Sequence, residues 1–215
     1  MLHSPPFDDV QDLGIAIRKV PGPRPQLHIG LLHKVENESA WLLNLRHFSD
    51  LKNEPPSDSY RWAQVEMDEI NRRALVALCR LLAKKLPSIP FGFTFDRSYI
   101  SKTGDYIFGE LGDGLTCATF VMAVFEAYHF PVLKKDEWPA ASPADSAWQQ
   151  FQVQVLLANR GPFVAEAVKQ HIGAPRYMPE QVMAGAASAK RPLGLAEATK
   201  LGAQIVRDLL ASNPP

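Results

Sequence analysis

The chain has 215 residues, of which 46% are hydrophobic and 21% are charged, and its 23 basic residues balance its 23 acidic ones. This length suits one domain with a substantial core, and the composition is that of a folded globular protein rather than a disordered one. Because nucleic acids and anionic membranes attract clustered positive charge, the zero net charge speaks against either of them as the main partner.

Cys79 and Cys117 are the two cysteines of the chain, and they give neither a disulfide framework nor the ligand spacing of a zinc site. Residues 1–14 lack the basic and then apolar segments of a signal peptide. No apolar run approaches the ~18 residues of a membrane-spanning helix. We therefore expect a protein of the reducing cytoplasm, with no integral membrane segment, and nothing in the pattern implies a metal or an organic cofactor.

Three strands are predicted near the N-terminus. Apolar segments with strand character cover residues 14–20, 26–33 and 40–47. A Pro-Gly-Pro turn follows the first of them, and a polar turn at 36–39 separates the other two. Two apolar runs joined by a short polar turn predict an antiparallel hairpin.

Helices dominate the rest of the chain. Residues 59–86 contain no glycine or proline and carry apolar residues at helical spacing, which predicts one long helix with an N-cap among Ser57, Asp58 and Ser59. The aromatic segments 91–96 and 106–108 predict short strands or extended loops. Further helices are predicted at 116–128, 142–171 with a break at Gly161-Pro162, 179–189 and 193–211.

This order of elements predicts an α+β fold, a small antiparallel sheet packed on the cysteine-bearing helix with additional helices around it. Residues 1–140 would form this core, with the helix at about 59–86 inserted in it. Residues 141–215 would form a helical C-terminal extension packed on the same domain.

Cys117 is the most informative position for chemistry, because it begins a predicted helix directly after a glycine-rich turn. A helix N-terminus stabilises negative charge, so this placement is expected to lower the pKa of a thiol. Its free backbone N–H groups can also hold an oxyanion. The alternative is a cysteine buried as a small hydrophobic residue, which is the interpretation we adopt for Cys79 in mid-helix.

A nucleophilic cysteine needs a base and a group that orients the base. His28 lies on the second predicted strand, and the two-residue strand period places Leu27 and Ile29 on the opposite face. Asn44 is a lone polar residue among leucines on the next strand and needs a hydrogen-bond partner if it is buried. Parity places His33 on the other face from His28. His47 remains an alternative to Asn44 if its strand carries a bulge.

The run Leu27-His-Ile-Gly-Leu-Leu, a second strand with a polar residue, and the later Thr116-Cys-Ala-Thr-Phe-Val resemble a known pattern. They are similar to the circularly permuted papain-like branch of the NlpC/P60 superfamily, which includes lecithin retinol acyltransferase-like proteins. In that branch the histidine strand precedes the cysteine helix. The resemblance covers roughly residues 26–48 and 104–130. It implies Cys117 as nucleophile, His28 as base and Asn44 as the orienting residue.

The resulting expectation is a cysteine hydrolase, a peptidase or amidase, or else an acyltransferase, acting on a peptide, amide or acyl substrate. An inactive papain-like module used for binding or scaffolding is the alternative from another class. In a third interpretation the resemblance is accidental and Cys117 is only part of the core.

Overall fold

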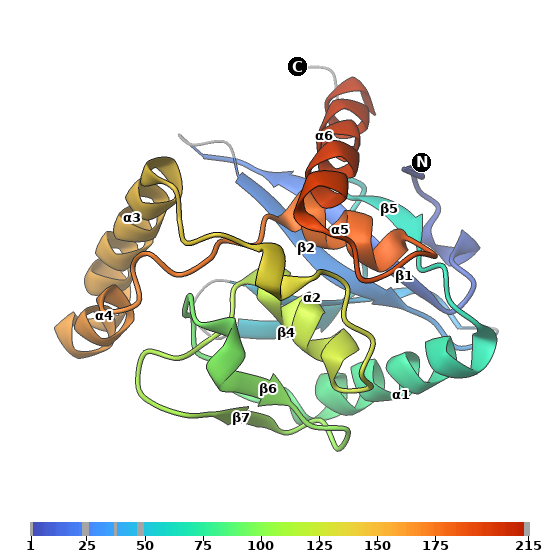
Figure 1. Cartoon of the computed structure of the whole chain (residues 1–215). Coiled ribbons are helices and arrows are strands. Elements are labelled where there is room, and N and C mark those ends of the chain that lie inside the picture. The colour runs from blue at the N-terminus through green and yellow to red at the C-terminus, as the bar shows by residue number, and fades with distance from the viewer. Residues whose placement is uncertain (1, 23–25, 37, 47–49, 213–215) are drawn as a thin grey trace.

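Five strands form an antiparallel sheet in the order β4-β3-β2-β1-β5, and two further strands form the hairpin β6-β7, in an α+β arrangement (Figure 1). This computed structural model describes the whole chain except residues 1, 23–25, 37, 47–49 and 213–215. The strands are β1 (Leu13–Val20), β2 (Gln26–His33), β3 (Trp41–Arg46), β4 (Asp50–Glu54), β5 (Arg61–Gln64), β6 (Ser98–Ile100) and β7 (Tyr106–Phe108). The helices are α1 (Glu69–Lys85), α2 (Cys117–Glu126), α3 (Pro143–Arg160), α4 (Pro162–Lys169), α5 (Pro179–Ala187) and α6 (Leu195–Ser212).

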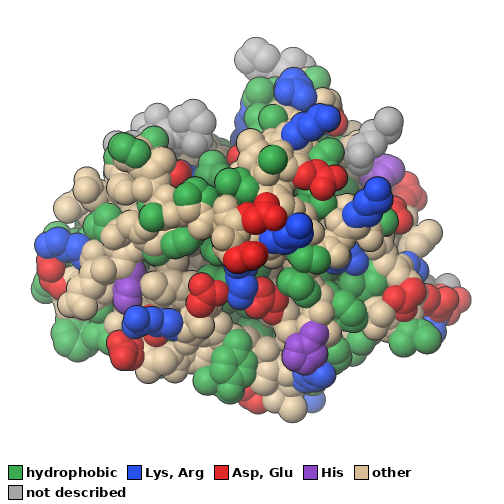
Figure 2. Space-filling view, viewed as in Figure 1, with side chains coloured by type: hydrophobic (Ala, Val, Ile, Leu, Met, Phe, Trp, Pro, Cys, Tyr) green, Lys and Arg blue, Asp and Glu red, His purple; other side chains and the backbone are tan. Residues whose placement is uncertain are grey.

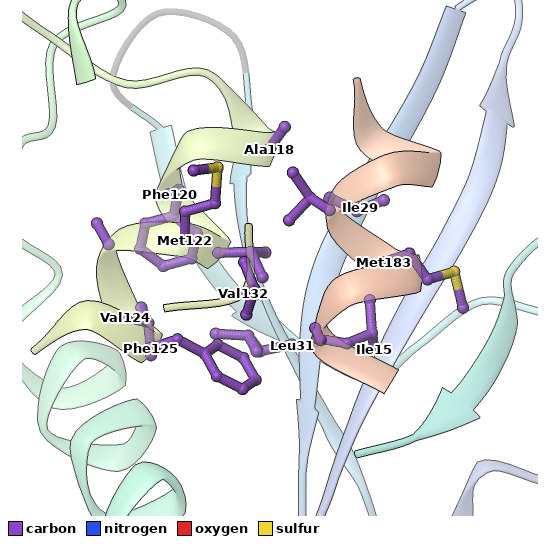
Figure 3. Packing of buried hydrophobic residues seen from close by; sticks show 14 of the residues in the cluster. Ile15, Ile29, Leu31, Ala118, Phe120, Met122, Val124, Phe125, Val132 and Met183 are labelled. Atoms are coloured by element: carbon purple, nitrogen blue, oxygen red, sulfur yellow. The ribbon is translucent and has the colours of Figure 1, made fainter. Parts of the chain in front are cut away.

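The two faces of the large sheet bury different sets of side chains. On one face Ile15, Ile29 and Leu31 belong to the main core, which also takes in α2 and α5 (Figure 3). On the other face Leu32 and Leu42 belong to a smaller cluster with Tyr60 and Trp62. The alternation follows from the two-residue period of a strand, and it assigns every residue of β2 to one face or the other.

Helix α2 is the central helix of the domain. All of its residues from Ala118 to Phe125 are buried, because it packs against the sheet, α1 and α5 at once. Figure 3 shows Phe120, Met122, Val124 and Phe125 of this helix among the labelled core residues. A helix that is apolar on all sides is expected at the centre of a core rather than at the surface.

The structure confirms most of the predicted elements. The strands at 14–20, 26–33 and 40–47 correspond to β1, β2 and β3 within one residue, apart from residue 47, which lies outside the described residues. The antiparallel pairing of β2 with β3 is present, with Leu31 opposite Leu43. The helices predicted at 116–128, 142–171 with its break, 179–189 and 193–211 are α2 to α6.

The prediction of one long helix at 59–86 is wrong in its first third. Helix α1 begins at Glu69, and its N-cap is Asp68, whose side chain accepts a hydrogen bond from the backbone N–H of Asn71. Arg61–Gln64 instead forms the edge strand β5 beside β1. The free backbone groups of the β1 edge supply a partner that local spacing could not indicate.

One strand was not predicted: β4 pairs with β3 so that Asn44 lies opposite Lys52. Of the two segments predicted as short strands or extended loops, 106–108 is the strand β7, and 91–96 is a loop that leads into a short 3-10 helix at Phe95–Arg97 before β6.

The C-terminal helices form two separate groups. Helices α3 and α4 pack on each other and lie away from α5 and α6 in Figure 1. Their small cluster, which includes Val153 and Leu156, encloses Phe93. Helix α5 packs on β1 and β2, and α6 packs on α5. The two groups therefore flank the start of α2 from different sides.

No helix among the described residues is long and apolar enough to cross a membrane.

Candidate active site

Cys117 is the first residue of α2 and is partly buried. Thr116 caps the helix, because its hydroxyl accepts a hydrogen bond from the backbone N–H of Thr119 at 3.2 Å. The turn before the helix lies tightly against another loop, since the N–H of Leu115 donates to the carbonyl of Pro90 at 2.8 Å. A Cβ at Gly114 would stand 2.3 Å from that same Pro90 oxygen. The glycine thus allows the backbone packing that fixes where Cys117 begins its helix.

His28 and Asn44 form a buried pair on neighbouring strands. Nε2 of His28 lies 3.0 Å from Oδ1 of Asn44, and Asn44 has no exposed surface. Both side chains lie on the sheet face opposite Ile29, as strand parity predicts. Gly30 makes the pair possible, because a Cβ there would stand 2.7 Å from Cβ of Asn44.

Glu54 on β4 determines which atom donates and which accepts in the hydrogen bond between His28 and Asn44. Nδ2 of Asn44 donates to Oε1 of Glu54 at 3.2 Å, and Arg46 forms an ion pair with the same carboxylate. A carboxylate only accepts, so the amide nitrogen of Asn44 must face Glu54 and its oxygen must face His28. It follows that Nε2 of His28 carries the hydrogen that is donated to Asn44. Nδ1 is then the ring nitrogen with the lone pair.

A cavity of about 570 Å³ is lined by both His28 and Cys117. Its wall includes Leu27 and His28 on β2 as well as Leu45 and Arg46 on β3. These four residues lie beyond the paired part of the two strands, because the pairing of β2 with β3 runs from His33 only as far as Leu31. The site therefore lies where the two strands separate.

Cys117 lines the same cavity from the α2 side and packs against the core on the Ile29 face of the sheet, whereas the His28 side chain lies on the other face. The backbone N–H of Ile29 lowers the pKa of the thiol, against the larger effect of burial. Of the three residues selected from the sequence, Cys117 and His28 line this cavity, whereas Asn44 is fully buried and is hydrogen-bonded to His28. Residues of α3, α6 and the segments that flank them also line the cavity, among them Trp148, Gln152 and Leu209.

The electrostatic expectation for Cys117 is wrong in its sign. Burial raises the pKa of the Cys117 thiol above its ordinary value, and this effect exceeds the opposing effects of the N–H groups of Ile29 and Ala118 and of the Arg176 guanidinium. The helix terminus does favour the thiolate, but removal of water from the sulfur disfavours it more. The resting thiol is therefore protonated at neutral pH and needs a base for attack.

The other candidates from the sequence lie elsewhere. Cys79 is fully buried in mid-helix, and burial raises the pKa of its thiol to about 12. Nε2 of His33 lies 2.8 Å from Oδ1 of Asn53, and burial lowers the pKa of this histidine. His47, the alternative third residue, lies outside the described residues.

Sequence reasoning did not find Glu54 or Arg176. Glu54 had one signal, its position on a polar segment after the Asn44 strand, but only the β3–β4 pairing places it beside Asn44. Arg176 lies on a loop 59 positions after Cys117 in the sequence, and no local pattern links the two. Its guanidinium forms an ion pair with Asp145 at 3.0 Å and stacks over the Trp148 ring at 4.0 Å.

No group of three or more His, Cys, Asp or Glu side chains suited to a metal ion occurs in the part of the chain that the structure describes. Charged side chains of both signs lie interspersed over the face seen in Figure 2. Models of protein families, curated proteins and solved structures gave no match to this chain.

Proposed function

We propose that this protein is a cysteine hydrolase, a peptidase or amidase, or an acyltransferase, which uses Cys117, His28 and Asn44 on an amide or ester substrate. The observation that supports the proposal is that His28, whose Nε2 lies 3.0 Å from Oδ1 of Asn44, lines the same cavity as Cys117. The order of a His strand, an Asn strand and then a Cys helix resembles the permuted papain-like enzymes of the NlpC/P60 superfamily and supports the same interpretation.

In this mechanism Nδ1 of His28 takes the proton of the thiol as the sulfur of Cys117 attacks the substrate carbonyl carbon. The carbonyl oxygen becomes an oxyanion, which the free backbone N–H groups at the start of α2 stabilise. The imidazolium then gives its proton to the leaving amine or alcohol, and a thioester on Cys117 remains. Water, or an acceptor alcohol or amine, attacks the thioester with His28 again as base.

Asn44 serves as a positioning residue. It accepts the hydrogen of Nε2 and so keeps the lone pair of His28 on Nδ1. Because the thiol of Cys117 is protonated at rest, the tautomer of His28 decides whether a base is available at the moment of attack.

One observation favours the alternative of a catalytically inactive binding module. Burial raises the pKa of Cys117, whereas a thiolate stabilised in the resting protein would give a nucleophile directly. An inactive module would still bind a ligand in the cavity, but no acyl group would be transferred to Cys117.

Trapping of the acyl-enzyme distinguishes the two functions. The full chain is mixed with 4-nitrophenyl acetate, and the mass of the protein and the release of nitrophenol are followed together. An enzyme gives a burst of nitrophenol with one acetyl group on Cys117, and Cys117→Ala and His28→Ala each abolish the burst. Cys79→Ala is the matched control and keeps it. Acetylation that is confined to lysines, or that is equal in the Cys117→Ala protein, would show that the chain is not such an enzyme.

A further inference from the structure

One face of α3 forms part of the cavity wall. Trp148, Gln149 and Gln152 all contribute to this wall. Residues one turn apart share a helix face, so Trp148 and Gln152 are neighbours along the cavity.

The two glutamines of this face differ in their hydrogen bonds. Gln149 is satisfied within the protein, because its amide donates to the carbonyl of Ala174 at 2.9 Å and accepts from the N–H of Gly173 at 2.8 Å. Gln152 is only 2% exposed, and its amide makes no hydrogen bond to any other described residue. The indole nitrogen of Trp148 is likewise buried without a partner among the described residues. Polar groups in protein interiors have partners, so the amide of Gln152, which lines the cavity, calls for one from a ligand.

The rest of this wall consists of aromatic and aliphatic side chains. The ring of Phe93 lies 5.5 Å from that of Phe91 and 6.0 Å from that of Trp148. Leu209 and Leu210 of α6 close the wall with aliphatic surface. Such a surface binds a large apolar group by excluding water from it.

The charged residues of the wall do not demand a charged ligand. Arg176 and Arg46 have ion-pair partners in Asp145 and Glu54. Lys19 is exposed at the rim of the cavity. Burial raises the pKa of Glu180, which favours the neutral acid in the wall.

We propose that this cavity binds a peptide segment that carries a large apolar or aromatic side chain, with a backbone amide of the segment paired to Gln152 and the side chain against the aromatic wall. A glutamine amide both donates and accepts, and a peptide group is its complement, whereas a hydrocarbon acyl chain offers it nothing. This inference names the substrate class and so rests on the proposed function.

Binding to the full-length Cys117→Ala protein tests the inference without turnover. Three neutral probes are titrated and followed by NMR chemical shifts: N-acetylphenylalaninamide, N-acetylglycinamide and octanamide. We expect the phenylalanine probe to bind about fivefold or more tightly than either of the others, because it alone has both the backbone amides and the aromatic ring. Adding Gln152→Leu is expected to weaken its binding about five- to tenfold, which corresponds to one hydrogen bond. Gln154→Leu, the same change on the exposed side of α3, is the matched control and leaves the affinity unchanged.

Octanamide binding as tightly as the phenylalanine probe would overturn the inference in favour of an acyl-chain pocket. Equal affinity of the Gln152→Leu and Gln154→Leu proteins for the phenylalanine probe would overturn it as well. Neither result would contradict the proposed function, which the burst of acylation on Cys117 tests separately. If the burst fails while the probe binds as expected, the proposed chemistry is wrong and the cavity is a peptide-binding site.

Discussion

The substitution Gly30→Ala tests whether the close approach of β2 and β3 builds the candidate active site. The added Cβ would stand 2.7 Å from Cβ of Asn44, 2.9 Å from the carbonyl oxygen of Leu43 and 3.0 Å from Cδ1 of Leu42. Ordinary contact begins at 3.4 Å, so Asn44 must move by about 0.7 Å. If it moves away from His28, their 3.0 Å hydrogen bond lengthens to about 3.7 Å, which is beyond hydrogen-bonding range.

Two measurements follow from these distances. Overpacking typically destabilises a protein by about 1–3 kcal/mol, and replacing a strand glycine by alanine returns about 0.5–1 kcal/mol. We expect a net loss of about 1–2 kcal/mol in the free energy of unfolding, measured by urea titration, and a fall in Tm of about 2–8 °C. The rate of the nitrophenol burst should fall about 10- to 100-fold, since His28 loses the partner that fixes its ring.

Gly14→Ala separates the loss of stability from the loss of the site. Gly14 lies on β1, and a Cβ there would stand 3.0 Å from Cγ2 of Val10 and 3.1 Å from the carbonyl of Ala63, away from the cavity. We expect a loss of stability with a burst rate close to that of the unaltered protein. If Gly30→Ala keeps its burst rate, or Gly14→Ala loses as much, the structural reasoning about the His28–Asn44 pair is refuted.

Three other predictions concern the same site. Asn44→Ala should remove the hydrogen bond that Nε2 of His28 makes with Asn44, which costs about 1–3 kcal/mol in urea unfolding. It should also slow the burst about 10- to 100-fold, and a burst at full rate would show that Asn44 has no positioning role. Cys79→Ala should lower stability by about 1 kcal/mol through lost packing and keep the burst, whereas Cys117→Ala should abolish the burst with little change in the urea midpoint. Because burial raises the pKa of Cys117, its alkylation by iodoacetamide should be slow at pH 7 and rise about tenfold per pH unit past the ordinary thiol pKa of about 8.5, as mapped by peptide mass. Rapid labelling of Cys117 at pH 6 would instead require a thiolate in the resting protein.

The local pattern of apolar and polar residues was enough to predict much of the fold. Strand alternation gave β1 to β3 and put His28 and Ile29 on opposite faces, because the two-residue period is a property of the extended backbone itself. The isolated polar Asn44 among leucines indicated a buried hydrogen bond, since an unpaired buried amide is unfavourable.

Local pattern failed where a segment takes its structure from a distant partner. Arg61–Gln64 is a strand because β1 offers it an edge, and the helical spacing of the surrounding residues carries no information about that edge. Glu54 orients Asn44 only because β4 folds back along β3.

The sequence by itself determined which residues are candidates for thiol chemistry, and the periodicity that puts His28 and Asn44 on one face. The tertiary structure alone decided that the β2–β3 pairing ends at Leu31 and that Cys117 and His28 line one cavity. It also decided the sign of the Cys117 pKa, because desolvation depends on every segment packed around the sulfur, whereas the helix terminus that favours the thiolate can be recognised within a few residues.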